Sequence, residues 1–225
     1  MELQISAFNR KEVLQYLGWR GTEITEDVEM AINKAIETTM NKIHPRYIWK
    51  EFEVDKSTWT LSGTDFELKG ENIKELLSSS NSVILLAATL GPEMDREITK
   101  AEPRSLTDAI ILDCCGSSAI ESVCDEATKT ILKSLPNDVY LTDRFSPGYG
   151  DFPLESQEGL IKILDTSRRI GLTLTESLIM VPRKSVTAVI GVSKEPQTKR
   201  FRGCAYCNMF ENCTYRKAGG YCGKT

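Results

Sequence analysis

Apolar residues at helical spacing predict helices along much of the chain. The clearest pattern runs from Ser105 to Leu135, and Pro136 ends it because proline cannot continue a helix. Asn9 and Thr25 are typical helix caps, and each precedes a further helical pattern. The predicted helices cover residues 9–17, 25–43, 73–77, 93–100, 105–135 and 156–164.

Other segments have the composition of β-strands. Residues 83–90 are apolar on both faces, which predicts a central buried strand. Residues 47–54 and 186–192 are rich in aromatic or β-branched residues and predict further strands, and residues 58–62 could pair with the first of these. Because helices and strands alternate only in part, their order favours the α+β class over a doubly wound parallel sheet.

A polar segment rich in glycine and proline, residues 142–155, interrupts this pattern. Within it, Pro147 fixes one backbone angle and Gly148 lets the backbone approach a ligand closely. Arg144 has the planar set of donors that suits a carboxylate, and Tyr149 offers an aromatic face to a cation. The segment therefore either binds a ligand that carries both kinds of charge or is an ordinary surface turn with an exposed arginine.

The long predicted helix carries an acidic residue beside its apolar stripe. Helical spacing places Glu121 at the flank of this stripe, where a carboxylate is costly unless it is paired. Its partner is either a cationic group of a ligand or a lysine or arginine of the protein, unless the side chain is exposed at the stripe edge. The predicted stripe consists of Leu106, Ile110, Ser117, Ile120, Cys124, Ala127 and Ile131.

Composition narrows the class of protein. The chain has 225 residues, of which 40% are hydrophobic and 27% charged, as in an ordinary globular protein. A net charge of -4 gives no reason to expect a nucleic-acid or anionic-membrane partner. Apolar runs fall well short of the roughly 20 residues that a membrane-spanning helix needs, and residues 1–18 do not resemble a signal peptide. We therefore expect a cytoplasmic protein with reduced thiols.

The chain ends in a segment rich in cysteine and glycine. We predict one main domain, residues 1–200, followed by a tail, residues 201–225, with a candidate metal site. Four thiolates could hold zinc or an iron–sulfur cluster, although the spacing C-x2-C-x5-C-x8-C matches neither a standard zinc ribbon nor a bacterial ferredoxin. The alternative is a tail with free thiols. The four cysteines are Cys204, Cys207, Cys213 and Cys222.

The segment around Arg144 resembles a known family. An arginine, three further residues and then Gly-Tyr stand here as Arg144, Gly148 and Tyr149, and residues 174–187 also look like the sequence that follows this motif in the family. The resemblance extends over residues 112–191. The family is the S-adenosylmethionine (AdoMet)-binding activation domain of vitamin B12-dependent methionine synthase, here in a free-standing form.

The resemblance implies a fold and a function. The fold would be a twisted, mainly antiparallel sheet with flanking helices. The chain would bind AdoMet and support reductive methylation of cob(II)alamin, as an accessory subunit of a cobalamin-dependent methyltransferase. The cobalamin would be carried by a partner, a methionine synthase or related corrinoid protein, and a flavodoxin- or ferredoxin-like protein would donate the electron.

The resemblance also implies roles for individual residues. Arg144 would bind the AdoMet carboxylate, and the backbone around Ser146 and Gly148 would contact the polar edges of the ligand. Tyr149 would be the catalytic residue, near the sulfonium and the cobalt. Glu121 would hold the ammonium or the ribose, and Asp138 would be a second acidic contact.

Two other functions remain open at the level of sequence. The cysteines are compatible with an iron–sulfur or zinc protein for redox or electron-transfer work without AdoMet chemistry. A non-catalytic AdoMet sensor or scaffold would bind the ligand but transfer no methyl group. The sequence has neither the glycine-rich fingerprint of Rossmann-type methyltransferases nor a D-x-H-x-x-G corrinoid-binding motif, so the corrinoid should lie on another protein.

Overall fold

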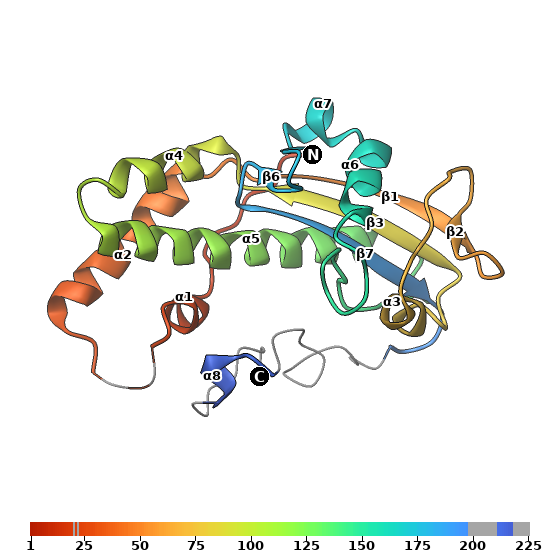
Figure 1. Cartoon of the computed structure of the whole chain (residues 1–225), viewed down its shortest axis with the longest axis horizontal. Coiled ribbons are helices and arrows are strands. Elements are labelled where there is room, and N and C mark those ends of the chain that lie inside the picture. Colours follow the sequence, from red (N-terminus) through yellow and green to blue (C-terminus); the bar gives the residue numbers. More distant parts are fainter. Residues whose placement is uncertain (20, 22, 198–210, 218–225) are drawn as a thin grey trace.

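The computed structural model describes residues 1–19, 21, 23–197 and 211–217. Its central element is an antiparallel sheet of five strands in the order β2-β1-β3-β7-β4 (Figure 1). These strands are β1 (Arg46–Asp55), β2 (Thr60–Leu61), β3 (Ser82–Thr89), β4 (Tyr140–Leu141) and β7 (Ser185–Ser193). A separate two-stranded hairpin pairs β5 (Thr173–Leu174) with β6 (Met180–Val181).

Strand β3 is central because both of its faces are apolar. Ile84 and Leu86 point into one hydrophobic core, whereas Val83 and Leu85 point into a second core on the opposite face. All four side chains are fully buried. β3 pairs along its whole length with β1 on one side and β7 on the other. The predicted central strand is thus confirmed.

Helices cover both faces of the sheet. The first core lies under four helices, α1 (Arg10–Tyr16), α2 (Glu26–Lys42), α4 (Pro92–Ala101) and α5 (Leu106–Ser134). The second core lies under α3 (Glu71–Leu76), α6 (Ser156–Leu164) and α7 (Thr166–Ile170). A short helix, α8 (Thr214–Lys217), lies in the last described segment. This arrangement confirms the α+β class and the mainly antiparallel sheet.

The long helix α5 forms where the sequence predicts it. The Ser105 side chain accepts a hydrogen bond from the backbone N–H of Asp108 at 3.2 Å, and the residue before Pro136 is extended. One part of the predicted stripe is wrong, however. Leu106 and Ile110 are 67% and 49% exposed, because the first turns of α5 bury other residues against the neighbouring helices. The buried residues of this part are Ala109, Ile111, Leu112, Cys114, Cys115 and Gly116.

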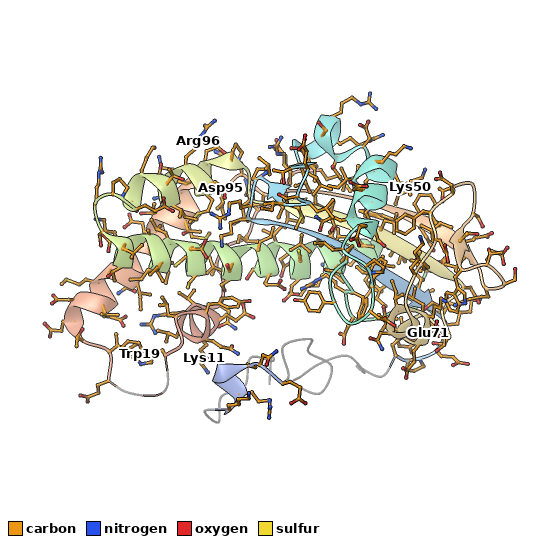
Figure 2. All side chains as sticks on the ribbon, viewed as in Figure 1. Lys11, Trp19, Lys50, Glu71, Asp95 and Arg96 are labelled. Atoms are coloured by element: carbon orange, nitrogen blue, oxygen red, sulfur yellow. The ribbon has the colours of Figure 1, made fainter. Side chains whose placement is uncertain are left out.

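Different helices pack against the two opposite sides of α5. In Figure 2, Asp95 and Arg96 of α4 lie above α5, whereas Lys11 and Trp19, from α1 and the turn after it, lie below it. Both α1 and α4 contact α5 directly.

Among the described residues, no helix is both long and apolar enough to cross a bilayer.

Candidate functional site

The segment that carries Arg144 is attached to the edge of strand β7. Phe145 and Val189 exchange backbone hydrogen bonds of 2.9 and 2.8 Å, and the N–H of Thr142 donates to the carbonyl of Gly191 at 3.0 Å. The Phe145 side chain packs into the second core. Since successive side chains of extended backbone point to opposite sides, Arg144 points the other way, towards α5. Its direction is therefore fixed by the pairing of its neighbours.

The turn that follows is held by its own backbone. The N–H of Gly148 donates to the carbonyl of Phe152 at 2.8 Å, and the φ angle of Gly148 is 90°, a region that favours glycine. The rings of Phe145 and Phe152 stack with centroids 6.2 Å apart. Asp151 accepts hydrogen bonds from the first N–H groups of α3. These contacts leave the side chain of Tyr149 at the surface, where it is 66% exposed.

Arg144 forms ion pairs with two acids of α5. Its Nη2 lies 2.8 Å from Oε2 of Glu121, and its Nη1 lies 2.8 Å from Oδ1 of Asp125. The two acids are four residues apart, so they lie one above the other on the same face of the helix. Burial alone would lower the pKa of Arg144, but the nearby Cys124 and the two carboxylates outweigh this and raise it above its usual value. The guanidinium is thus a fixed positive charge.

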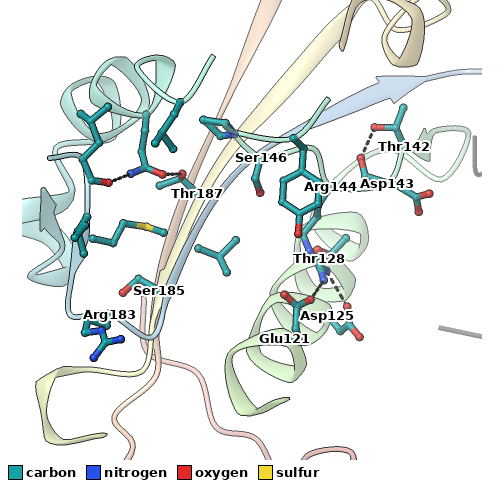
Figure 3. Close-up of a pocket in the computed structure, with 18 of the residues that line it drawn as sticks. Glu121, Asp125, Thr128, Thr142, Asp143, Arg144, Ser146, Arg183, Ser185 and Thr187 are labelled. Carbon is teal, nitrogen blue, oxygen red and sulfur yellow. Dashed lines mark hydrogen bonds and ion pairs between the residues drawn. The ribbon is translucent and has the colours of Figure 1, made fainter. Parts of the chain in front are cut away.

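A groove of about 920 Å³ opens beside this cluster (Figure 3). α5 and the Arg144 segment supply a charged wall, while the start of α6 and the β5–β6 hairpin supply an apolar one. The charged wall includes Glu121, Asp125, Thr128, Lys129, Thr142, Asp143, Arg144 and Ser146. The rest of the lining includes Pro147, Tyr149, Leu154, Gln157, Leu178, Ile179, Met180, Arg183, Ser185, Val186 and Thr187.

The apolar wall is anchored by a buried glutamine. Nε2 of Gln157 donates to the carbonyl of Leu178 at 2.9 Å, and Oε1 of Gln157 accepts from the hydroxyl of Thr187 at 3.4 Å. The N–H of Arg183 donates to Asp95 on α4 at 2.7 Å. These bonds join the hairpin to α6, β7 and α4, so both walls are attached to the main sheet or to helices that pack on it.

The structure brings most of the predicted site residues together. Glu121, Arg144, Ser146 and Tyr149 all line the groove, and Gly148 forms the turn between the last two. The partner that Glu121 was expected to need is Arg144 itself.

Asp138 does not join this group. It lies outside the groove lining, its side chain is 65% exposed, and its nearest cation is Lys194 at 3.6 Å. Its position therefore gives no support to the predicted ligand contact, and we leave it out of the site.

Sequence reasoning missed other residues of the groove. Asp125 could have been found, because it follows Glu121 by four residues and so shares its helical face. Gln157 and the hairpin residues Leu178 to Met180 had no comparable signal, because only the tertiary fold brings them opposite α5.

The predicted metal site lies mostly outside the described residues. Cys204, Cys207 and Cys222 are not described, and the described Cys213 is partly buried, with its sulfur 3.3 Å from the N–H of Arg216. Within the described part of the chain, no group of three or more His, Cys, Asp or Glu side chains could hold a metal ion. Zinc and iron–sulfur binding by the tail therefore stay a prediction.

The fold and groove define a class of protein: an α+β domain with a surface groove beside an arginine that is paired with two acids. Comparison with known proteins makes this more specific. Residues 123–207 match the family model described as vitamin B12 dependent methionine synthase, activation domain. Arg144, Gly148 and Tyr149 lie inside this match, and Glu121 lies just before it.

The structure is also similar to a solved one, the crystal structure of the MetH reactivation domain bound to AdoHcy. The TM-score is 0.66 at 14% sequence identity, and the alignment covers 98% of this chain and 85% of that chain. A comparison with curated proteins gives no match. Residues 123–207 thus match the activation-domain model, and the chain has the fold of a reactivation domain, which confirms the predicted resemblance.

Proposed function

We propose that this chain binds AdoMet in the groove and supports reductive methylation of cob(II)alamin on a separate methionine synthase or related corrinoid protein. One observation carries the proposal. The Arg-x3-Gly-Tyr segment, which lies within the match to the activation-domain family, forms one wall of the groove and fixes its arginine against α5. The likeness to a reactivation domain bound to AdoHcy adds support.

The charges of the wall suit this ligand. AdoMet carries a carboxylate, an ammonium and a sulfonium, so it has one more positive than negative charge. Glu121 and Asp125 together carry one more negative charge than Arg144 offsets. The N–H groups of Arg144 that do not face these acids would bind the ligand carboxylate. Oε2 of Glu121 accepts from Arg144, so Oε1 would accept from the ligand ammonium.

The methyl transfer itself needs positioning more than proton transfer. An electron from a flavodoxin- or ferredoxin-like donor reduces cob(II)alamin to cob(I)alamin. The cobalt electron pair then forms a bond to the AdoMet methyl group while the carbon–sulfur bond breaks, and the bonding pair of that bond stays on sulfur as AdoHcy. The protein would hold the sulfonium at the groove mouth and exclude water. Tyr149, exposed at that mouth, would lie against the incoming corrinoid.

The proposal is tested in two steps. Calorimetric titration with AdoMet and AdoHcy first measures binding to the purified chain. The chain is then mixed anaerobically with a corrinoid protein that holds cob(II)alamin, a low-potential chemical reductant and AdoMet, and the absorption spectrum follows methylcobalamin. We expect methylcobalamin only when chain, reductant and AdoMet are all present, and omission of each in turn provides the controls.

Other results would point to the other functions. AdoMet binding without methylcobalamin formation would indicate a sensor or scaffold and would contradict the reactivation role. Stoichiometric iron and sulfide in a chain that does not bind AdoMet would overturn the whole proposal in favour of a redox protein.

A further inference from the structure

Lys184 stands where the apolar wall of the groove joins the main sheet. It lies between the β5–β6 hairpin and β7, and both of its sequence neighbours, Arg183 and Ser185, line the groove. These two neighbours lie across the groove from Glu121 (Figure 3). The carbonyl of Lys184 accepts a hydrogen bond from the N–H of Leu90, the residue after β3, at 3.0 Å. The backbone that carries the Lys184 side chain is thus attached to the sheet.

The Lys184 side chain crosses to α5, the helix of the charged wall. Its ammonium lies 2.8 Å from Oδ1 of Asp113 and donates to the hydroxyl oxygen of Ser117 at 2.9 Å. The Lys184 side chain is only 12% exposed, so the lysine end of this ion pair is largely shielded from water. Its stem passes over Gly116, where an added Cβ atom would lie 3.1 Å from Cε and 3.2 Å from Cγ of Lys184. The glycine therefore allows the lysine to approach the helix closely.

Lys184 and Arg144 hold the same side of α5. Four residues at intervals of four supply their contacts, and each lies about one turn beyond the one before it. They are Asp113, Ser117, Glu121 and Asp125. Lys184 bonds to the first two, and Arg144 bonds to the last two. The acids of the groove are therefore attached to the hairpin side through Lys184 and to the glycine-rich segment through Arg144.

We propose that Lys184 is a positioning residue, which together with Arg144 fixes the distance between the apolar wall and the acids of α5. This inference rests on the proposed function. With its amino-acid end at Arg144 and Glu121, AdoMet would place its adenosine end against the apolar wall. A ligand that spans both walls depends on their spacing, whereas a ligand that touches one wall does not. Loss of the Lys184 pair would release one of these attachments and weaken the spanning ligand selectively.

Calorimetry of Lys184→Met tests this role, because methionine keeps most of the stem and removes the charge. We expect affinity for AdoMet and AdoHcy, which span both walls, to fall by about threefold to tenfold. Affinity for 5′-methylthioadenosine, which lacks the amino-acid part, should not change. Lys56→Met is the matched control, since Lys56 is also partly buried, donates to the carbonyl of Leu77 and lies outside the groove lining. It should bind all three ligands as the unmodified chain does.

A second variant tests whether Lys184 acts through its acid. Asp113→Ala removes a carboxylate that is 42% exposed and lies outside the groove lining. It should show the same selective loss, and it replaces Lys184→Met if that variant unfolds. The double variant should lose no more AdoMet affinity than Lys184→Met alone, because both changes break the same pair. Additive losses would overturn the inference.

The other outcomes separate this inference from the proposed function. Unchanged AdoMet affinity in Lys184→Met, in a chain that otherwise binds AdoMet, overturns the inference alone, even if the variant loses stability. An equal loss of affinity for 5′-methylthioadenosine also overturns it, because the apolar wall itself would then have changed. Failure of the unmodified chain to bind AdoMet overturns both the inference and the proposed function.

Discussion

The guanidinium of Arg144 donates to the carboxylate of Glu121 across 2.8 Å, and this bond joins the glycine-rich segment to α5. The sequence left open whether Glu121 pairs with a ligand or with the protein. The structure shows that it pairs with the protein, at the place where the ligand is expected. The same acid can therefore orient the arginine and still accept a hydrogen bond from a ligand through its second oxygen.

Replacing Arg144 should remove most of the AdoMet affinity. We expect Arg144→Ala to weaken binding by about 2 kcal/mol or more, because it removes the charge-assisted pair with the ligand carboxylate and takes a positive charge away from Glu121 and Asp125. Calorimetry measures the change. Arg183→Ala is a matched control, since Arg183 also lines the groove but is exposed. Equal losses of AdoMet affinity in the two variants would show that binding depends only on the total charge of the groove and not on the position of Arg144.

Neutralising Asp125 should weaken AdoMet binding less than replacing Arg144 does. Asp125→Asn keeps the shape of the side chain but removes one of the two charges that orient Arg144, so we expect AdoMet affinity to fall by about 1 kcal/mol. Asp108→Asn is the matched control on the same helix, because Asp108 is exposed in the first turn of α5 and lies outside the groove lining. If the control loses as much affinity as Asp125→Asn, the orienting role of Asp125 is wrong.

The fold was predictable from the sequence where a pattern of apolar residues repeats over a long segment. The helix from Ser105 to Leu135 and the strand over residues 83–90 follow from spacing alone, because many side chains must face the same way. The exposure of Leu106 was not predictable, since apolar spacing does not say where the covering helices stop. Strands of two residues, such as β4, are too short to carry a repeat.

The site was predictable only where one segment carries several of its groups. Arg144 and Tyr149 stand in one short motif, and Asp125 lies one turn beyond Glu121. Gln157, in contrast, lines the same groove only because the tertiary fold brings α6 opposite α5, and such an arrangement of residues distant in sequence depends on tertiary packing.

The alkaline stability of the protein should depend on Tyr16. Burial, with the charges of Glu121 and Glu12 adding to it, raises the pKa of Tyr16, the last residue of α1, from the ordinary value of 10.0 to about 12. The folded state therefore holds this proton more tightly, so the stability it contributes is complete below pH 10 and is lost as the pH rises from 10 to 12. Denaturant unfolding of the unmodified chain and of Tyr16→Phe should show a difference in unfolding free energy that is constant below pH 10. Above pH 10 the unmodified chain should lose stability relative to the variant. A difference that stays constant throughout this range would contradict the assignment.

Gly191 should control both stability and the position of the arginine segment. A Cβ atom added there would overlap with Oγ of Ser80 and would lie 2.8 Å from both Cδ2 of Leu77 and Cγ2 of Thr142, which is too close for carbon atoms. Thr142 bonds to the backbone of Gly191 and stands two residues before Arg144. We expect Gly191→Ala to lower the free energy of unfolding by about 1–3 kcal/mol and also to weaken AdoMet binding, because relief of the overlap displaces Thr142.

A substitution at a second glycine, Gly63, separates the loss of stability from the loss of AdoMet affinity. Gly63 has a φ angle of 75° and nothing within 4 Å of an added Cβ, and it lies outside the groove lining. Gly63→Ala should therefore cost stability through backbone strain but leave AdoMet affinity unchanged. Denaturant unfolding and calorimetry on both variants make the comparison. If both lose stability and neither loses affinity, the pairing of Thr142 with Gly191 does not set the direction of Arg144, and the guanidinium is positioned by its two acids alone.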